Sequence, residues 1–190
     1  MGKLTFKGFG PPDDPMFQGG AELFSKVGRL HSANQWRPSM IISGGQTGVD
    51  RAALDWAIAH KVPHGGWCPK GRLASDGRLP DHYQLIETAS AGYSQRTRAN
   101  VMQADATLIL TCGPLVGGSK LTLRFACGTS KPSFIVDLDL PLGQQLQKLR
   151  DWQKAQPPIY IINLAGPSES RCPGIYDKTL DFMNQYLGDN

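Results

Sequence analysis

Two glycine-rich segments carry residue types that bind phosphate groups. The first directly follows the apolar run 40–43 and consists of Gly44, Gly45, Gln46, Thr47 and Gly48. Glycines let a backbone approach a ligand closely, and the free N–H groups at a helix start attract anions. We therefore predict phosphate binding by all five residues, with Thr47 capping the next helix. The alternative is that the segment is an ordinary tight strand-to-helix turn, since such turns have the same composition.

The second segment repeats this arrangement further along the chain. It follows the apolar run 106–112, and we expect five of its residues to bind a ligand: Gly117, Gly118, Ser119, Lys120 and Thr122. The backbone N–H groups and the Ser119 hydroxyl would hold phosphate oxygens, and Lys120 would neutralise charge. Parallel strands present their carboxyl ends at the same edge of a sheet, so the two segments together predict one binding cleft.

A polar stretch, 69–80, supplies two further basic candidates. Lys70 and Arg72 are expected to reach an anionic ligand, since both side chains are long and positively charged. A solvated loop is the alternative, because exposed lysine and arginine are the norm.

Three carboxylates are candidates for acid–base chemistry: Asp50, Glu87 and Glu169. Asp50 sits in the first turn of the expected helix, where it would also stabilise the helix dipole. On the same helix, Arg51 and Asp55 stand four residues apart and are expected to pair on its outer side.

A metal site is not expected from the sequence. The candidate ligands are His60, His64, Cys68 and His82, but Gly65 and Gly66 break any helical register among them. The spacing also fits no known zinc pattern.

The elements that must position these residues follow from the apolar runs. Strands are expected at 39–43, 65–68, 83–87, 106–112, 133–137 and 159–165, and helices at 48–60, 94–103, 123–129, 143–156 and 173–187. Strands that alternate with helices indicate a parallel sheet covered on both faces. We predict an α/β, three-layer Rossmann-like fold with a mostly parallel sheet of about five or more strands.

The domain organisation expected from the sequence is simple. Residues 37–190 should form a single Rossmann-like nucleotide-binding domain. Residues 1–36 read as an N-terminal extension, partly irregular, with one short helix within 21–30. The 190 residues suit one domain with a sizeable core.

Composition narrows the functional classes. The net charge is +4 and aromatic residues make up 8% of the chain, so single-stranded nucleic-acid binding has little support. No apolar run approaches a membrane span, and the first residues lack a signal-peptide core, so we expect a cytoplasmic protein. The four cysteines are widely spaced and should be reduced thiols, with Cys112 and Cys127 in the core.

Taken together, the motifs resemble the molybdenum carrier family, a circularly permuted branch similar to the lysine-decarboxylase-like (LOG-type) and DNA-processing Rossmann-like proteins. The matching segments are 43–51, 66–72, 96–101, 117–122, 131–132 and 164–170, and the resemblance runs from about residue 39 to the C-terminus. It implies a Rossmann-like fold that binds a nucleotide or a nucleotide-derived ligand. The family name implies transport of the pterin-phosphate molybdenum cofactor rather than of a bare ion.

One departure from the LOG-type pattern bears on catalysis. Those phosphoribohydrolases carry a glycine-rich loop followed by a glutamate, whereas Leu123, Arg124 and Phe125 stand at the corresponding place here. The leading hypothesis is therefore a carrier or sensor of a phosphate-bearing nucleotide-derived or molybdopterin-type ligand. N-glycosidic cleavage of nucleoside monophosphates is the alternative, nucleic-acid binding is the second alternative, and a homo-oligomer stays open.

Overall fold

The computed structural model describes residues 37–188, so the expected extension 1–36 and its short helix lie outside the described part. The strands are β1 Met40–Ile42, β2 His64–Gly65, β3 Trp67–Cys68, β4 Leu73–Ala74, β5 Gly77–Arg78, β6 Ile86–Glu87, β7 Ala106–Thr111, β8 Ser133–Asp137 and β9 Ile161–Ala165. The helices are α2 Val49–Ala59, α3 Tyr93–Gln103, α4 Gly117–Gly128, α5 Leu142–Lys154 and α6 Ile175–Leu187.

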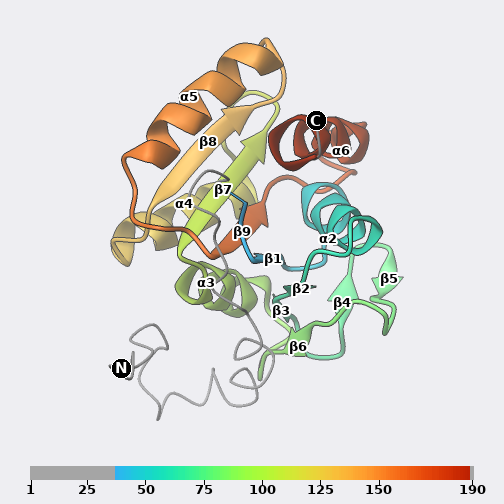
Figure 1. Ribbon diagram of the computed structural model, residues 1–190. Helices are drawn as coiled ribbons and strands as arrows, with labels where there is room; N and C mark the ends of the chain where they lie inside the picture. The colour runs from blue at the N-terminus through green and yellow to red at the C-terminus, as the bar shows by residue number, and fades with distance from the viewer. Residues whose placement is uncertain (1–36, 189–190) are drawn as a thin grey trace.

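Five parallel strands form the central sheet in the order β2-β1-β9-β7-β8 (Figure 1). Every residue of β1, β7 and β9 is buried, as expected for strands covered on both faces. This sheet with its flanking helices confirms the predicted α/β, Rossmann-like fold.

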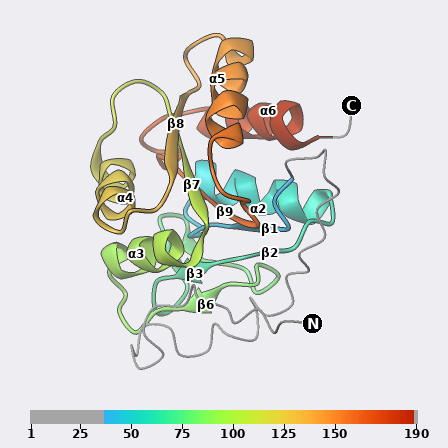
Figure 2. The ribbon, with the colours of Figure 1, turned by 60° about the vertical axis from the view of Figure 1, so that its left-hand side comes forward.

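Helices cover both faces of the sheet. The side chains of α2, α5 and α6 share one core cluster with the central strands, including Trp56, Leu149 and Phe182. On the opposite face, Ala99 of α3 packs with Met40 and Ile42, and α4 lies beside α3 (Figure 2). These layers enclose the central strands, and the loops that follow the strands therefore begin from the packed core.

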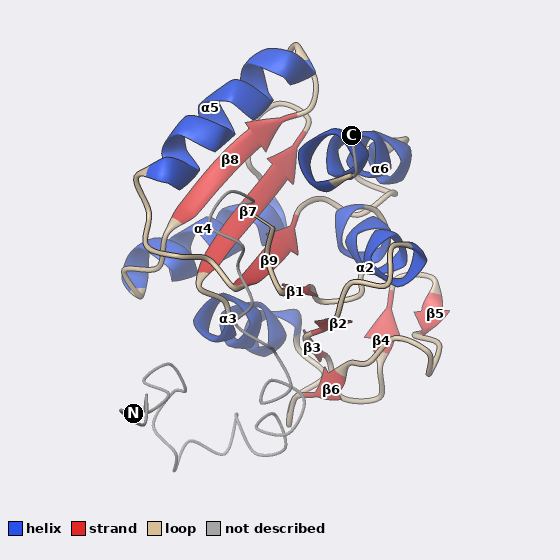
Figure 3. Ribbon diagram, viewed as in Figure 1, coloured by secondary structure: helices blue, strands red, loops and turns tan. Residues whose placement is uncertain are grey.

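Two small sheets fill the segment between α2 and α3 (Figure 3). β3 pairs with β6 in parallel, and β4 with β5 forms an antiparallel hairpin. The expected strand 65–68 is split, because Gly66 has a φ of 127° and its ideal Cβ would lie 2.2 Å from the Ser43 carbonyl oxygen. Such a contact is open only to glycine.

Helix α4 begins at Gly117, six residues before the expected start at 123. The sequence prediction was wrong here because it placed both glycines in a loop. A first helical turn needs no apolar face, and it tolerates glycine at modest cost. Gly117, Gly118, Ser119 and Lys120 are therefore first-turn residues.

The cysteines are all free thiols. Cys112 is partly buried, but Cys127 is exposed, so its expected place in the core was wrong. The periodicity of α4 turns Cys127 outward while Ala126 packs inward. Within residues 37–188, no helix is long and apolar enough to cross a membrane.

Candidate functional site

The glycine-rich segments lie at the carboxyl edge of the parallel sheet, where three loops meet. We call them the edge loops: 43–48 after β1, 112–117 after β7, and 166–171 after β9. The first and third lead to α2 and α6 on one face, whereas the second leads to α4 on the other face. Ligands of open parallel sheets bind where neighbouring connections diverge in this way.

Close backbone contacts hold the edge loops together. The ideal Cβ of Gly48 would lie 2.5 Å from the Pro167 carbonyl oxygen and 2.7 Å from the Glu169 nitrogen. The ideal Cβ of Gly166 would lie 2.7 Å from the Leu110 carbonyl oxygen. The loops after β1 and β9 therefore touch each other, the loop after β9 also packs against the end of β7, and two glycines are required for the fit.

The start of α4 offers backbone donors to this edge. Val116 provides no side-chain cap, and the first helical hydrogen bond runs from the Lys120 N–H to the Val116 carbonyl at 3.4 Å. Among the described residues, the N–H groups of Gly117, Gly118 and Ser119 meet no acceptor. Free N–H groups at a helix start are donors of the kind that bind anions in proteins.

Arg171 places a guanidinium against this helix start. The ideal Cβ of Gly117 would lie 2.7 Å from Arg171 Nη1, so the arginine packs directly over the glycine. Arg171 is itself exposed, so its charge is accessible to an incoming ligand. Guanidinium and backbone N–H groups together are donors that match a phosphate group.

A buried ion pair lies behind the first edge loop. Arg96 of α3 donates from Nη1 to Asp50 Oδ2 at 2.8 Å, with Asp50 only 2% exposed. The guanidinium crosses Gly44, whose ideal Cβ would lie 1.6 Å from Arg96 Nη1. Burial raises the pKa of Asp50, and the charge of Arg96 opposes that rise.

Arg96 and Arg171 were not among the residues selected from the sequence. Arg96 stands in one of the family-like segments, 96–101, and Arg171 directly follows another, 164–170. Those segments were the available signal. Nothing local to either arginine showed that it would lie against a glycine of a distant loop.

Thr47 does not cap α2, so this expectation was wrong. The cap position is Gly48, and no side chain closes the helix start. The Thr47 hydroxyl instead lies 3.1 Å from the hydroxyl of Ser75, in the turn between β4 and β5. The Thr47 hydroxyl therefore pairs with the hairpin and not with the backbone N–H groups at the start of α2.

Arg51 and Asp55 do not pair with each other. Arg51 makes a two-pronged contact with Asp76, both distances being 3.1 Å. Asp55 accepts hydrogen bonds from the hydroxyls of Tyr83 at 2.6 Å and Tyr176 at 2.8 Å. An i,i+4 pair contributes only about 0.2–0.5 kcal/mol, so these tertiary partners prevail.

Arg72 is buried inside its own loop. Its guanidinium donates to four backbone carbonyls, those of Leu79, Pro80, Tyr83 and Leu85, at 2.8–3.2 Å. These four hydrogen bonds give Arg72 a structural role inside the loop. Lys70 is exposed at the turn before it.

The two glutamate candidates both hold backbone N–H groups. Glu87 accepts from the Gly71 N–H, and Glu169 accepts from the N–H groups of Gly174 and Tyr176 at the start of α6. Of the three candidate carboxylates, Asp50 is the one in contact with the first edge loop, through the Gln46 N–H at 3.3 Å.

The remaining predicted residues divide between helix and surface. Ser119 and Thr122 are buried in α4, and the Thr122 hydroxyl donates to the Gly118 carbonyl at 3.0 Å. Lys120 is exposed. Gly45 packs its α-carbon against Leu79 and Leu85, whose methyl groups would lie 2.8 Å from an ideal Cβ. In the described part, no three His, Cys, Asp or Glu side chains could hold a metal ion.

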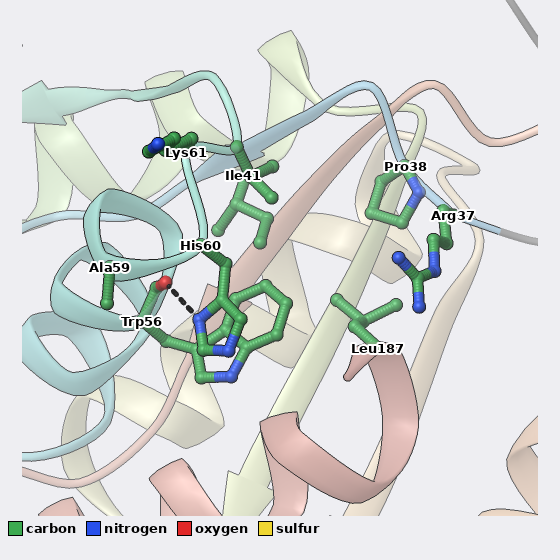
Figure 4. A pocket seen from close by; sticks show the side chains of 9 residues that line it. Arg37, Pro38, Ile41, Trp56, Ala59, His60, Lys61 and Leu187 are labelled. Atoms are coloured by element: carbon green, nitrogen blue, oxygen red, sulfur yellow. Dashed lines mark hydrogen bonds between the residues drawn. The ribbon is translucent and has the colours of Figure 1, made fainter. Parts of the chain in front are cut away.

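A separate pocket of about 220 Å³ lies at the opposite edge of the sheet (Figure 4). Its walls include the ends of α2 and α6, with Trp56 and His60 stacked at 4.0 Å between ring centroids. His60 follows the last turn of α2, and its Nδ1 lies 2.9 Å from the Trp56 carbonyl oxygen. This pocket shares no residue with the edge loops.

Comparisons with known proteins agree with this architecture. Residues 41–187 match the circularly permutated YpsA SLOG family. A crystal structure described as that of a "putative molybdenum carrier protein" from Syntrophus aciditrophicus SB is 46% identical in sequence, with a TM-score of 0.76. The match covers 79% of this chain and 95% of that one. No curated protein matches the chain. The chain therefore belongs to the circularly permutated YpsA SLOG family.

Proposed function

We propose that this protein binds a phosphate-bearing, nucleotide-derived or molybdopterin-type ligand at the edge loops, as a carrier or sensor. The observation that carries the proposal is the start of α4, where three N–H groups have no acceptor among the described residues and the Arg171 guanidinium packs against Gly117. A phosphate group placed there gains charge-assisted hydrogen bonds and the favourable end of the helix dipole.

The other edge loops have supporting roles in this proposal. Gly44 and Gly48 bring the loop after β1 against Arg96 and the loop after β9, and these parts together would form one wall of the ligand site. Ser119 adds a hydroxyl, and Lys120 adds a positive charge from the first turn of α4. Family membership and the molybdenum carrier name of the related crystal structure support a small-molecule ligand.

A molybdopterin ligand fits the residues through its phosphate rather than its metal. The donors at the edge are N–H, hydroxyl and guanidinium groups, which recognise phosphate oxygens. Bound in this way, the cofactor would be carried through its phosphate, and the pterin rather than the protein would hold the metal. Arg171 and the N–H groups of 117–119 would fix the phosphate end.

Titration calorimetry with AMP tests this proposal. Arg171→Ala should weaken binding at least tenfold, since a hydrogen bond to a charged group contributes about 1.5–3 kcal/mol. Arg124→Ala is the matched control, because Arg124 is an exposed arginine further along α4 and should leave the affinity unchanged. Equal affinities for wild type and Arg171→Ala would overturn the assignment of the site.

A second candidate function is N-glycosidic cleavage of a nucleoside monophosphate. The observation in its favour is Asp50, a buried carboxylate beside the first edge loop whose pKa is raised by burial. A raised pKa suits a general acid. Incubation with each monophosphate should release free base, and Asp50→Asn should stop that release. No base from any monophosphate would rule this function out.

A further inference from the structure

The side-chain oxygen of Gln46 is surrounded by hydrogen-bond donors. Gln46 Oε1 accepts from the Thr47 N–H at 2.9 Å, the Ser75 N–H at 2.9 Å and the Ser75 hydroxyl at 2.8 Å. The Thr47 hydroxyl lies 3.5 Å away. The donors come from two separate elements, the first edge loop and the β4–β5 hairpin.

This number of donors exceeds what a neutral amide oxygen needs. An amide carbonyl oxygen has two lone pairs, whereas each oxygen of a phosphate accepts several charge-assisted hydrogen bonds. Because all neighbours of this atom are donors, the oxygen rather than the amide nitrogen must occupy the position. The donor set is thus better matched to an anionic oxygen than to its present occupant.

The hairpin that provides Ser75 is firmly attached at both ends. Arg72 and Leu79 flank it and are buried, and Arg51 ties Asp76 to the carbonyl of Gly45. These attachments do not involve the Gln46 side chain. The donors of Ser75 and Thr47 would stay in place if that side chain turned away, and the contacts are exposed, so it has room to do so.

We propose that Thr47 and Ser75 form an oxyanion-binding subsite that the Gln46 side chain occupies until a phosphoryl group displaces it. The sequence interpretation had Gln46 contact the ligand, whereas here Gln46 competes with it. The inference rests on the proposed function, since it places a second phosphoryl group of the same ligand, such as that of a nucleoside diphosphate, at the first edge loop while the first one lies at the start of α4. It adds Ser75 as a ligand residue, which neither its position nor its neighbours had indicated.

Binding of inorganic phosphate, followed by titration calorimetry, tests the inference. Gln46→Ala removes the competing side chain, so the donors of Thr47 and Ser75 become free to bind phosphate. Phosphate binding should then tighten about tenfold, as expected when charge-assisted hydrogen bonds are gained. Adding Ser75→Ala to Gln46→Ala should cancel most of the gain. Gln147→Ala is the control, since Gln147 is an exposed glutamine on α5 and should change nothing.

The sign of the change separates the explanations. Weaker or unchanged phosphate binding by Gln46→Ala, with an unaltered melting temperature, would overturn the inference. The proposed function would survive that result if Arg171→Ala still weakened AMP binding. Loss of the Arg171 effect together with a gain in Gln46→Ala would instead leave the subsite standing and overturn the assignment at α4.

Discussion

Gly48→Ala gives the sharpest test of how the edge loops are joined. Gly48 has φ 79° and ψ −129°, a backbone conformation open essentially to glycine, so alanine costs about 1–3 kcal/mol in strain. Its Cβ would also lie 2.5 Å from the Pro167 carbonyl oxygen, which is backbone and cannot turn aside. The two loops must then separate.

Separation of the loops adds to the strain. The hydrogen bond from the Val49 N–H to the Pro167 carbonyl would be lost, at about 0.5–1.5 kcal/mol. Alanine also lowers the conformational entropy of the unfolded chain relative to glycine, and this effect offsets about 0.4–1 kcal/mol of the loss. We expect a net loss of about 2 kcal/mol in the free energy of unfolding, or about 4–8 °C in melting temperature for a chain of this size.

Urea unfolding monitored by circular dichroism measures this loss, with Gly174→Ala as the matched control. Gly174 also has a positive φ, 84°, but its ideal Cβ meets nothing within 4 Å. The control should therefore lose only the strain of a left-handed residue, about 1–2 kcal/mol, less the same unfolded-state entropy effect of about 0.4–1 kcal/mol. Equal losses for the two variants would refute the packing of the edge loops described above.

Two further predictions concern the segment between α2 and α3. Arg72→Lys should lower the free energy of unfolding by about 2–3 kcal/mol in urea melts, because an ammonium group cannot reach four carbonyls, yet leave AMP affinity unchanged; a selective loss of affinity would show a ligand role instead. The Arg51 hydrogen bond lowers the pKa of Asp76 below its ordinary 3.8, so the tie between hairpin and α2 is present above that pH and is lost as the pH falls through the lowered pKa. Protection factors of the amides of residues 73–78, which correct for the intrinsic pH dependence of exchange, should fall in that acid range for wild type and be low at all pH values in Asp76→Asn. Wild-type protection factors that do not change through that range would contradict this.

Gly45 illustrates why the choice of variant matters. A glycine in a ligand loop invites substitution by valine to block binding. Here the first added carbon would lie 2.8 Å from methyl groups of both Leu79 and Leu85. Gly45→Val would thus disturb the packing of Leu79 and Leu85. Any loss of binding would report that disturbance rather than a lost ligand contact.

The fold was predictable because its signals are local. Runs such as 106–112 and 133–137 are apolar over a strand's length, and they became β7 and β8 within one residue. The same reliance on apolar residues placed the start of α4 too late, because this helix begins at Gly117 on residues that have no apolar face. Local composition reports burial well, but it does not report where a helix's first turn lies.

The site was predictable only in part, because its decisive contacts are long-range. The glycines of both segments were identified from their loops, but the contacts that need them come from elsewhere in the chain. Arg96 lies against Gly44 and Arg171 lies against Gly117, whereas an ideal Cβ at Gly118 meets nothing within 4 Å. The role of Arg72 was missed for a related reason. The neighbours of an arginine in sequence do not show whether it is buried or solvated. Only the fold brings the four backbone carbonyls to the Arg72 guanidinium.

The most direct test of the proposed function is a crystal structure of the protein with AMP bound. We predict that the phosphate lies at the start of α4, within hydrogen-bond distance of the N–H groups of 117–119 and of the Arg171 guanidinium. A phosphate found away from the edge loops, for example in the pocket lined by Trp56 and His60, would contradict the account.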